Sequence, residues 1–446
     1  MHSSPERAPK KDQFSDWLLV SCAAQLRMTT SHETRVKTTT VGRSRRHEFA
    51  VVAVLCFAWG VVSIEYLSVS YLAPFIEPAL NLSNIQLGIL VSGFSALFGL
   101  SSYATGVIAD RSGKRRELLV SVLLAFSAAS LLSGLATSFL TLLAARLLMG
   151  LLEGPILPLA QSIVAIEIPI ERRGLKMGIV QGLGFGLSSV APLLLVALAG
   201  RYGWRSGFFV VAVPGLVCAA LSAIILRRGT SSAPSEKGRA TISADSAAEG
   251  RGSALRSRNV WICSALSAVY ITYFLTVVSF LPLFYVKVRQ LPPAAMSALM
   301  SSVGVAGIVM GVIIPALADR IGRKPAAILA SAVGLLCPVA ALVYVGPLPI
   351  LWLLMFIGLA PIGVPILSMS TIPAESVPAQ WISRAIGLCV AFGTMIGGGA
   401  GPTIAGWIAD RWNLRGVLLF QAGCAALMAV LAMALRETLI HRPAES

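Results

Sequence analysis

The stretch TGVIADRSGKRREL, residues 105–118, places six charged residues between two long apolar segments. A second stretch, PALADRIGRKPA at residues 315–326, repeats its Ala-Asp-Arg core, and Asp319 lies 209 residues after Asp110. The same offset superposes Arg111 on Arg320, Gly113 on Gly322, Lys114 on Arg323, Arg115 on Lys324, Pro169 on Pro378 and Gly178 on Gly387. One offset that aligns several loops indicates an internal duplication.

The composition indicates that water is not the main solvent of this chain. Of its 446 residues, 56% are hydrophobic and only 13% are charged, and the mean hydropathy is +0.79. Soluble domains carry about 25% charged residues. The apolar runs match the roughly 20 residues that carry a helix across the hydrocarbon of a bilayer. The sequence therefore predicts an integral membrane protein with many spans.

The apolar runs between charge clusters and Gly/Pro turns predict twelve transmembrane helices, so the predicted fold is all-α. The spans are expected at residues 50–75, 85–109, 117–137, 139–166, 175–199, 206–226, 259–286, 294–318, 325–346, 348–372, 384–408 and 415–435. A polar Ser/Ala/Gly-rich segment separates the sixth span from the seventh and lacks apolar periodicity. The predicted organisation is a disordered basic tail (1–48), a six-helix bundle (49–226), a linker (227–258), a pseudo-symmetric second bundle (259–436) and a short tail (437–446).

The net charge of +16 is distributed in a way that favours a membrane over nucleic acid. With a cytoplasmic N-terminus, 29 Lys and Arg residues fall in inner tails and loops and six in outer loops. The outer six are Arg201, Arg205, Lys287, Arg289, Arg411 and Arg415. This asymmetry follows the positive-inside rule. We expect both termini in the cytoplasm, a cell membrane of bacterial inner-membrane type, and the lipid bilayer as the main partner.

Cysteine and histidine usage argues against a metal site. Six of the seven cysteines lie singly in separate apolar segments, without a CxxC pair, and read as small hydrophobic residues. All four histidines lie in the polar tails. We therefore expect neither a metal nor any other cofactor.

Three ionisable residues lie well inside predicted spans: Glu65 in span 1, and Arg146 and Glu153 in span 4. Each costs about 2.5–3.5 kcal/mol at a helix centre on insertion scales, so such residues are functional candidates. Arg146 and Glu153 share one helix face about 10 Å apart along the axis. They are too distant to satisfy one another, and Glu65 is the expected partner. A structural ion pair between helices is the alternative, and the functional interpretation is favoured.

Two motifs carry a resemblance to a known family. GVIADRSGKRR at residues 106–116 resembles the loop 2–3 signature of the major facilitator superfamily, with its degenerate partner in loop 8–9. The resemblance covers residues 50–436. RLLMGLLEGP at 146–155 and YGWRSGFF at 202–209 are similar to the anion:cation symporter branch, whose members move organic acids, sugar acids or phosphate with protons or sodium.

The superfamily resemblance implies a conformational latch in the duplicated loops. Its residues are Gly106, Asp110, Arg111, Gly113 and Arg115 in the first copy, and Asp319, Arg320, Gly322 and Arg323 in the second. By this resemblance, Asp110 caps the start of span 11 near Arg384, and Asp319 does the symmetric task near Gly174. A contact present in only one state makes a two-state element. The alternative is that these charges only keep the loops in water and fix the topology.

The branch resemblance implies that Arg146 lies beside the substrate carboxylate, while Glu153, together with Glu65, carries the proton. The branch often has Asp-Arg in span 1, where this chain has Glu65-Tyr66. Tyr66 can donate one hydrogen bond to a substrate but not a bidentate charge-assisted pair. Tyr270, Tyr273 and Gln181 are further candidates for neutral contacts with substrate, and core packing is their alternative.

These features predict a secondary active transporter, monomeric and without enzymatic activity, that takes up an organic anion (a carboxylate or sugar acid) with protons by alternating access. A proton-coupled exporter of drugs or metabolites is the main rival, because Glu65 without an arginine beside it can serve a cation. A membrane enzyme is disfavoured because the spans contain no histidine and no loop shows a carboxylate pair with metal-ligand spacing. A channel or receptor is disfavoured because a twofold repeat favours alternating access.

Overall fold

The computed structural model describes residues 45–112, 114–226, 257–378 and 381–438. Within this part of the chain, twelve helical stretches are long and apolar enough to cross a membrane. Their number and order confirm the sequence prediction, and most of their ends lie within a few residues of the predicted ones.

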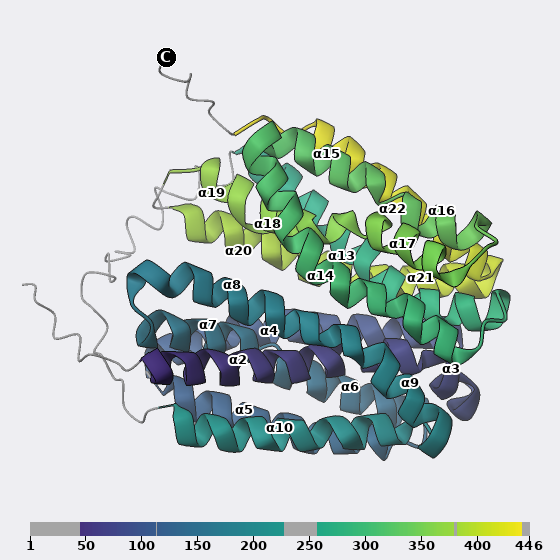
Figure 1. Ribbon diagram of the computed structural model, residues 1–446, viewed down its shortest axis with the longest axis horizontal. Coiled ribbons are helices and arrows are strands. Elements are labelled where there is room, and N and C mark those ends of the chain that lie inside the picture. Colours follow the sequence, from purple (N-terminus) through teal and green to yellow (C-terminus); the bar gives the residue numbers. More distant parts are fainter. Residues whose placement is uncertain (1–44, 113, 227–256, 379–380, 439–446) are drawn as a thin grey trace, which may run out of the picture. The chain divides into compact units, whose positions relative to one another are not determined.

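The first half runs from the purple to the teal part of Figure 1 and forms spans 1 to 6. Its segments are α2 (Arg45–Tyr66) and α3 (Ser68–Leu80), α4 (Asn84–Ser112), α5 (Arg115–Gly134), α6 (Phe139–Glu153) and α7 (Ile156–Glu167), α8 (Ile170–Gly186), η1 (Leu187–Val190) and α9 (Ala191–Tyr202), and α10 (Arg205–Ile225).

The second half runs from green to yellow and forms spans 7 to 12. Its segments are α13 (Arg258–Leu283) and η2 (Phe284–Val288), α14 (Pro293–Ile321), α15 (Arg323–Val333) and α16 (Leu336–Val343), α17 (Leu348–Gly358), η3 (Ala360–Gly363), α18 (Val364–Ile366), η4 (Leu367–Thr371) and α19 (Ile372–Glu375), α20 (Ile382–Phe392), η6 (Gly393–Gly398) and α21 (Gly399–Trp412), and α22 (Leu414–Met433).

Span 1 extends further than the sequence predicted. The prediction ended it at residue 75, whereas α3 continues to Leu80 with Pro74 and Pro78 inside the helix. Proline interrupts soluble helices, but neighbouring helices and local adjustments tolerate it in membrane spans. The helix ends at Asn81, whose left-handed backbone (φ 49°) closes the turn into α4.

Close helix packing within the first half depends on a glycine. Gly150 of α6 lies against the backbone of Phe94 in α4, where an added Cβ would overlap the Phe94 carbonyl. Small residues let backbones approach closely in membranes, where helix association depends on van der Waals packing and interhelical hydrogen bonds. This contact fixes α6, which carries Arg146 and Glu153, beside α4, which carries Phe94 and Ser95.

The two halves meet through contacts that repeat with the predicted offset of 209 residues. The hydroxyl oxygens of Ser70 and Ser279, which are 209 positions apart, lie 3.2 Å from each other. Ser95 packs against Gly398, and the equivalent positions, Gly304 and Ser189, also pack against each other. A residue touching its own copy, beside a pair of equivalent contacts, is what a pseudo-twofold axis between parallel repeats produces.

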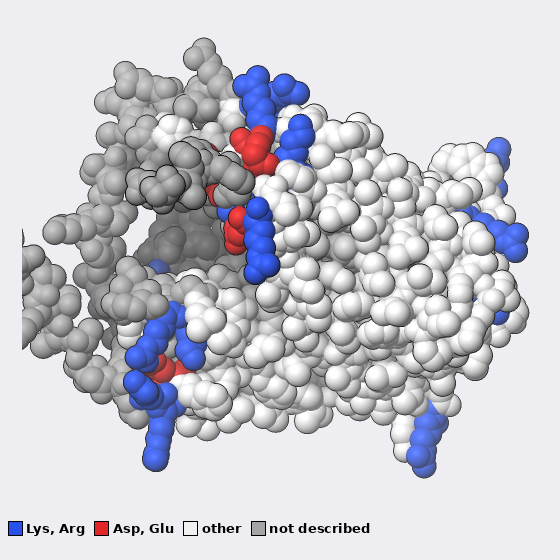
Figure 2. Space-filling model, turned by 45° about the horizontal axis from the view of Figure 1, so that its top comes forward, with Lys and Arg blue, Asp and Glu red and all other residues white. Residues whose placement is uncertain are grey.

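Charged side chains gather at two ends of the face drawn in Figure 2, and a broad band of uncharged residues lies between them. Large apolar side chains stay exposed on the helices, among them Val213, Val312 and Leu419, each at least 60% exposed. Exposed apolar surface on this scale marks a surface that meets lipid. We call the end with the loops at residues 81–83, 203–204, 289–292 and 413 the short-loop end, and the end with residues 114 and 322 the cassette end.

Candidate functional site

An ion pair inside the first half joins the two predicted partners Glu65 and Arg146. Arg146 Nη1 donates to Glu65 Oε1 at 3.1 Å. Glu65 is completely buried and Arg146 is 2% exposed. The predicted contact between spans 1 and 4 is therefore present. Removing one partner of such a pair strongly destabilises the folded protein, because the other charge is left buried and uncompensated.

The Arg146 guanidinium also contacts an aromatic face. Its Cζ lies 4.4 Å from the ring centroid of Phe94 in α4. A cation over an aromatic ring gains about 0.5–2 kcal/mol, more when water is excluded. With a carboxylate on one side and a ring on another, Arg146 is held in a fixed position although it lies in an apolar span.

Glu153 is the last residue of α6 and is completely buried. Neither of its carboxylate oxygens has a hydrogen-bond partner among the described residues. The charges of Arg146 and Glu65 still act on it through space. An ionised carboxylate with no donor is very costly to bury, whereas a protonated carboxyl is far less so.

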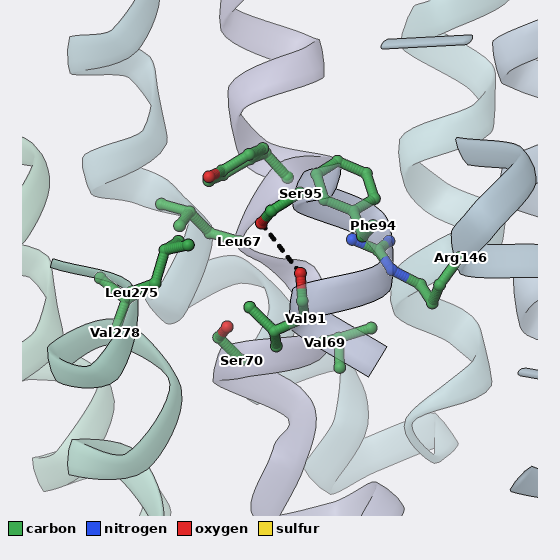
Figure 3. Close-up of a pocket in the computed structure, with 10 residues that line it drawn as sticks. Leu67, Val69, Ser70, Val91, Phe94, Ser95, Arg146, Leu275 and Val278 are labelled. Atoms are coloured by element: carbon green, nitrogen blue, oxygen red, sulfur yellow. Dashed lines mark hydrogen bonds between the residues drawn. The ribbon is translucent and has the colours of Figure 1, made fainter. Parts of the chain in front are cut away.

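A small pocket adjoins this ionic group and draws its lining from both halves. It is lined by Tyr66, Leu67, Val69, Ser70, Val91, Phe94, Ser95, Arg146, Leu275 and Val278. Figure 3 shows the guanidinium of Arg146 beside the Phe94 ring, across the pocket from Leu275 and Val278 of α13. The Ser95 hydroxyl donates to the Val91 carbonyl at 2.9 Å. Arg146 is the charged member of this otherwise apolar and hydroxyl-bearing lining.

Two of the predicted neutral contacts lie near this pocket. Tyr66 lines it, and its ring packs edge-on against Phe94, with 5.2 Å between the ring centroids. Tyr270 of α13 lies close enough to Tyr66 for the two to interact electrostatically. Its ring stacks on Phe274 at 6.1 Å. The structure thus brings tyrosines from spans 1 and 7 to the same region.

Tyr273 and Gln181 are placed elsewhere. The Tyr273 hydroxyl donates to the carbonyls of Gly334 (2.9 Å) and Gly358 (3.3 Å), so it joins helices within the second half. Gln181 Oε1 accepts from Gln161 Nε2 at 3.3 Å, a contact between α8 and α7. Neither residue lines the pocket. The observed contacts of Tyr273 agree with the alternative interpretation, a role in core packing, because its hydroxyl already donates to two backbone carbonyls.

The first copy of the predicted latch lies mostly outside the described residues. This applies to Gly113 and to the side chains of Asp110 and Arg111, and the surroundings of Gly106 and Gly174 are likewise undescribed. Arg115 begins α5 at the cassette end. The expected contact of Asp110 with the start of span 11 therefore stays a prediction.

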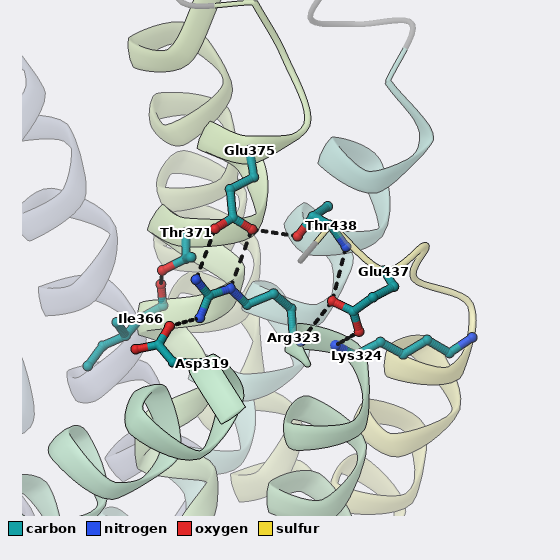
Figure 4. Close-up of polar contacts among 8 residues, drawn as sticks. All are labelled: Asp319, Arg323, Lys324, Ile366, Thr371, Glu375, Glu437 and Thr438. Carbon is teal, nitrogen blue, oxygen red and sulfur yellow. Dashed lines mark hydrogen bonds and ion pairs between the residues drawn. The ribbon is translucent and has the colours of Figure 1, made fainter. Parts of the chain in front are cut away.

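The second copy belongs to a charge network within the second half, drawn in Figure 4. Asp319 accepts from the guanidinium of Arg323. Arg323 also donates to Glu375 through Nη2 at 3.0 Å. Glu437 accepts from the backbone N–H groups of Arg323 (2.9 Å) and Lys324 (3.0 Å), and so caps the start of α15. In this structure Asp319 is thus paired with Arg323, four residues further along the chain.

Two other predicted members of this copy differ in their surroundings. Gly322 has φ +105°, a left-handed conformation that glycine adopts without strain. It connects α14 directly to α15 and so positions the N–H groups that Glu437 caps. Arg320 is exposed.

Sequence reasoning missed two contacts that join the halves at the short-loop end. Lys287 Nζ lies 2.5 Å from Glu77 Oε1. Asp410 accepts hydrogen bonds from Asn84 and Ile85 at the start of α4. A signal for the second was present: the tetrapeptide Ile-Ala-Asp-Arg of residues 108–111 recurs at residues 408–411.

Twelve spans in two related halves, with a cationic pocket lined from both, form the architecture of a membrane transport fold. The model of the Major Facilitator Superfamily matches residues 49–394, and the chain belongs to this superfamily. It is therefore a multi-pass membrane protein of this superfamily.

Among curated proteins, the chain is 27% identical over 166 residues to a probable sulfoacetate transporter of Cupriavidus necator. It is 31% identical over 176 residues to a hexuronate transporter of Bacillus subtilis, and 34% identical over 137 residues to a multidrug resistance protein of Serratia proteamaculans. These matches cover 37%, 38% and 30% of this chain. They span 38%, 40% and 33% of the relatives' own lengths.

Solved structures share the fold at low sequence identity. A bacterial homologue of the human lysosomal transporter Spinster, in an inward-facing and occupied conformation, matches with a TM-score of 0.70 and 17% identity, over 88% of this chain and 97% of that one. A D-xylose–proton symporter matches with a TM-score of 0.70 and 17% identity, over 87% and 98%. At this identity the likeness concerns the fold.

Proposed function

We propose that the protein takes up a small organic anion, a carboxylate or sugar acid, together with protons by alternating access. The observation that carries the proposal is Arg146: it is buried, bound to Glu65, and exposed to a pocket lined from both halves. The relatives named for sulfoacetate and hexuronate transport support an anionic substrate.

The geometry suggests that Glu65 and the substrate carboxylate compete for the guanidinium of Arg146. A substrate carboxylate in the pocket reaches Arg146 from the side opposite to α6, and it replaces the contact with Glu65 most easily when Glu65 binds a proton. Proton and anion then each favour the binding of the other, and this linkage is reciprocal. Transport of both in one cycle follows when the loaded site is exposed to the other side.

Glu153 is the second proton-binding group in the proposal. Its unpartnered and fully buried carboxyl favours the protonated form in this conformation. Since the charges of Arg146 and Glu65 act on Glu153, loss of its proton strengthens the hold of the carboxylates on Arg146 and disfavours a bound anion. Glu153 is thus expected to couple release of the proton to release of the substrate.

The contacts between the halves at the short-loop end fit a conformation that is closed on that side. The halves are joined at the short-loop end by Glu77 with Lys287 and by Thr403 with Ser92, whose hydroxyl oxygens are 2.9 Å apart. The predicted topology makes the short-loop end the outer one. We therefore assign this conformation as closed to the outside.

The test is uptake into proteoliposomes of sulfoacetate, a hexuronate and a galactonate, with and without an inward proton gradient. Arg146→Ala is expected to abolish uptake of the active substrate, and Glu153→Gln to abolish its dependence on the gradient. Arg411→Ala, an exposed arginine at the short-loop end, is the matched control and should behave as wild type. Full gradient-driven accumulation by Glu153→Gln contradicts the proposed coupling.

Proton-coupled export of drugs or metabolites is the second candidate. Tyr66 occupies the position at which the branch often carries arginine, and the match to a multidrug resistance protein supports this possibility. The direction of coupling separates the two. An acidic outside drives a symported anion inward, whereas it drives an antiported drug outward.

A further inference from the structure

Asp410, the last acidic residue of α21, binds the start of α4 in the other half. Its Oδ1 accepts from the Asn84 side-chain amide at 2.7 Å and from the Asn84 backbone N–H at 3.1 Å. Its Oδ2 accepts from the Ile85 backbone N–H at 2.9 Å. One carboxylate thus receives three donors from the first turn of a helix in the opposite half.

The local sequence at the start of α4 provides no partner for the backbone N–H groups of Asn84 and Ile85, so a group from the other half can bind them. Ser83 caps α4 itself, since its hydroxyl accepts from the Gln86 backbone N–H at 3.2 Å, while Gln86 Oε1 accepts from the Ser83 N–H at 2.9 Å. This reciprocal pair does not reach the N–H groups of Asn84 and Ile85. The first N–H groups of a helix have no partner within the helix, and they attract negative charge through the helix dipole. Asp410 supplies that charge.

The two helices run antiparallel along a long contact. Pro402 of α21 lies against Gly88 of α4, and further toward the short-loop end Gly406 lies against Asn84. Next to the Gly88 contact, further from the short-loop end along α4, the Thr403 hydroxyl hydrogen-bonds with that of Ser92. Asp410 therefore lies at the outermost point of a seam between the halves, where a small rotation of the halves produces the largest separation.

The same tetrapeptide ends both helices of this pair. Ile-Ala-Asp-Arg occupies residues 108–111 near the C-terminus of α4 and residues 408–411 near the C-terminus of α21. Because the helices are antiparallel, the two copies lie at opposite ends of the seam. The copy at the short-loop end contacts the N-terminus of the partner helix through Asp410.

We propose that Asp410 is a latch that holds the short-loop end closed and is released when the transporter opens to that side. The inference rests on the alternating-access cycle of the superfamily, and it does not depend on the substrate or the coupling ion. Opening exchanges the contacts of Asp410 with α4 for contacts with water. The contact is water-accessible, so its loss shifts the balance of states without unfolding either half.

The exposed neighbouring pair of Glu77 and Lys287 is expected to add less. The Lys287 side chain is 42% exposed, and exposed ion pairs contribute roughly 0–1 kcal/mol. Hydrogen bonds from backbone N–H groups to a carboxylate are stronger because they are charge-assisted and their donors are fixed by the helix.

The test measures the distance between the halves at the short-loop end in the substrate-free protein. Spin labels are attached at Thr137 and Val345, exposed loop positions in the first and second half. Cysteine-free protein that retains uptake provides the background. Double electron–electron resonance then gives the populations of the closed (shorter) and open (longer) distances.

Asp410→Ala is expected to raise the ratio of open to closed populations about tenfold, the effect of losing charge-assisted hydrogen bonds. Asn84→Ala removes one of three donors and should give a smaller shift in the same direction. Arg411→Ala changes the adjacent exposed charge and should leave the ratio as in wild type.

A distance distribution for Asp410→Ala equal to that of Arg411→Ala overturns the latch. Where Asp410→Ala is not recovered from membranes, Asp410→Asn, which keeps the volume and one acceptor, is measured in its place, and an unchanged ratio has the same consequence. Because no substrate or gradient is used, this result is independent of the uptake experiment. Failure of proton-driven uptake would contradict the proposed function and leave the latch standing.

Discussion

The two halves share one helical architecture, but they differ in the charged residues that they bury. Glu65, Arg146 and Glu153 are buried in the first half. The positions 209 residues later hold Phe274, Met355 and Ile362, which are all apolar. The close packing contacts of Ser70 with Ser279 and of Ser95 with Gly398 follow the repeat, whereas the charges do not.

This difference indicates a division of roles. In the second half, Tyr285 contacts the sulfur of Met355 at 3.0 Å, so the position equivalent to Arg146 is part of ordinary packing. Buried charges in a membrane span are retained at a considerable cost in free energy. In the proposed mechanism, the first half binds the proton and the charged part of the substrate. The second half then contributes apolar walls such as Leu275 and Val278.

The largest expected effect comes from removing the charge that distinguishes the halves. Arg146→Ala should lower the uptake rate at least about thirtyfold, because a charge-assisted contact with the substrate is lost. Met355→Leu, a volume-conserving change at the equivalent position, should stay within about twofold of wild type. Initial uptake rates at equal protein levels provide the measurement, and equal losses in both variants would remove the distinction between the halves.

A second variant separates coupling from binding. Glu153→Gln keeps the shape of the side chain but cannot exchange a proton. In a gradient of one pH unit, worth about 1.4 kcal/mol per proton, the wild type can accumulate substrate about tenfold, and the variant is expected to reach only equilibrium. The Glu153→Gln variant should still exchange labelled for unlabelled substrate across the membrane. Ile362→Val is the matched change in the second half, and its accumulation should equal that of the wild type.

A smaller effect is expected from two tyrosines that occupy different environments. Tyr66→Phe removes a hydroxyl from the pocket lining and should raise KM for the anion about two- to tenfold. Tyr273→Phe leaves the carbonyls of Gly334 and Gly358 without their donor and should lower stability by about 1 kcal/mol while KM is unchanged. KM values and thermal unfolding, measured on both variants, test this contrast. A raised KM for Tyr273→Phe would indicate that Tyr273 contacts the substrate.

The smallest effect belongs to the cassette end of the second half. Glu437→Gln weakens the cap on the N–H groups of Arg323 and Lys324 and should reduce stability by about 0.5–1 kcal/mol. Uptake should be unchanged because the network of Figure 4 lies within one half. Thermal unfolding compared with Glu117→Gln, an exposed glutamate of the first half, measures the difference.

The sequence predicts the fold well because composition and the 209-residue offset act over the whole chain. It also predicts the contact of Glu65 with Arg146, because two buried charges in a membrane have few partners to choose from. It does not predict which face of a span a neutral residue occupies. Tyr270 and Tyr273 are three positions apart in one helix, yet only Tyr270 lies near Tyr66.

The contacts between the halves were the part that the sequence could not provide. Asp410 and Asn84 are 326 residues apart, and their contact depends on the conformation that the two halves adopt. The recurrence of Ile-Ala-Asp-Arg marks the residue but not its partner. Similarly, the prediction ended span 1 at residue 75, directly after Pro74, whereas α3 continues through Pro74 and Pro78 to Leu80.

The most direct measurement is the simultaneous flux of protons and substrate into proteoliposomes, with a pH-sensitive dye inside and a labelled anion outside. The account predicts that addition of the anion acidifies the lumen in the wild type, and that both fluxes vanish in Arg146→Ala. Anion entry without proton entry, or fluxes of wild-type size in Arg146→Ala, would contradict the claim that the buried charges of the first half couple the two.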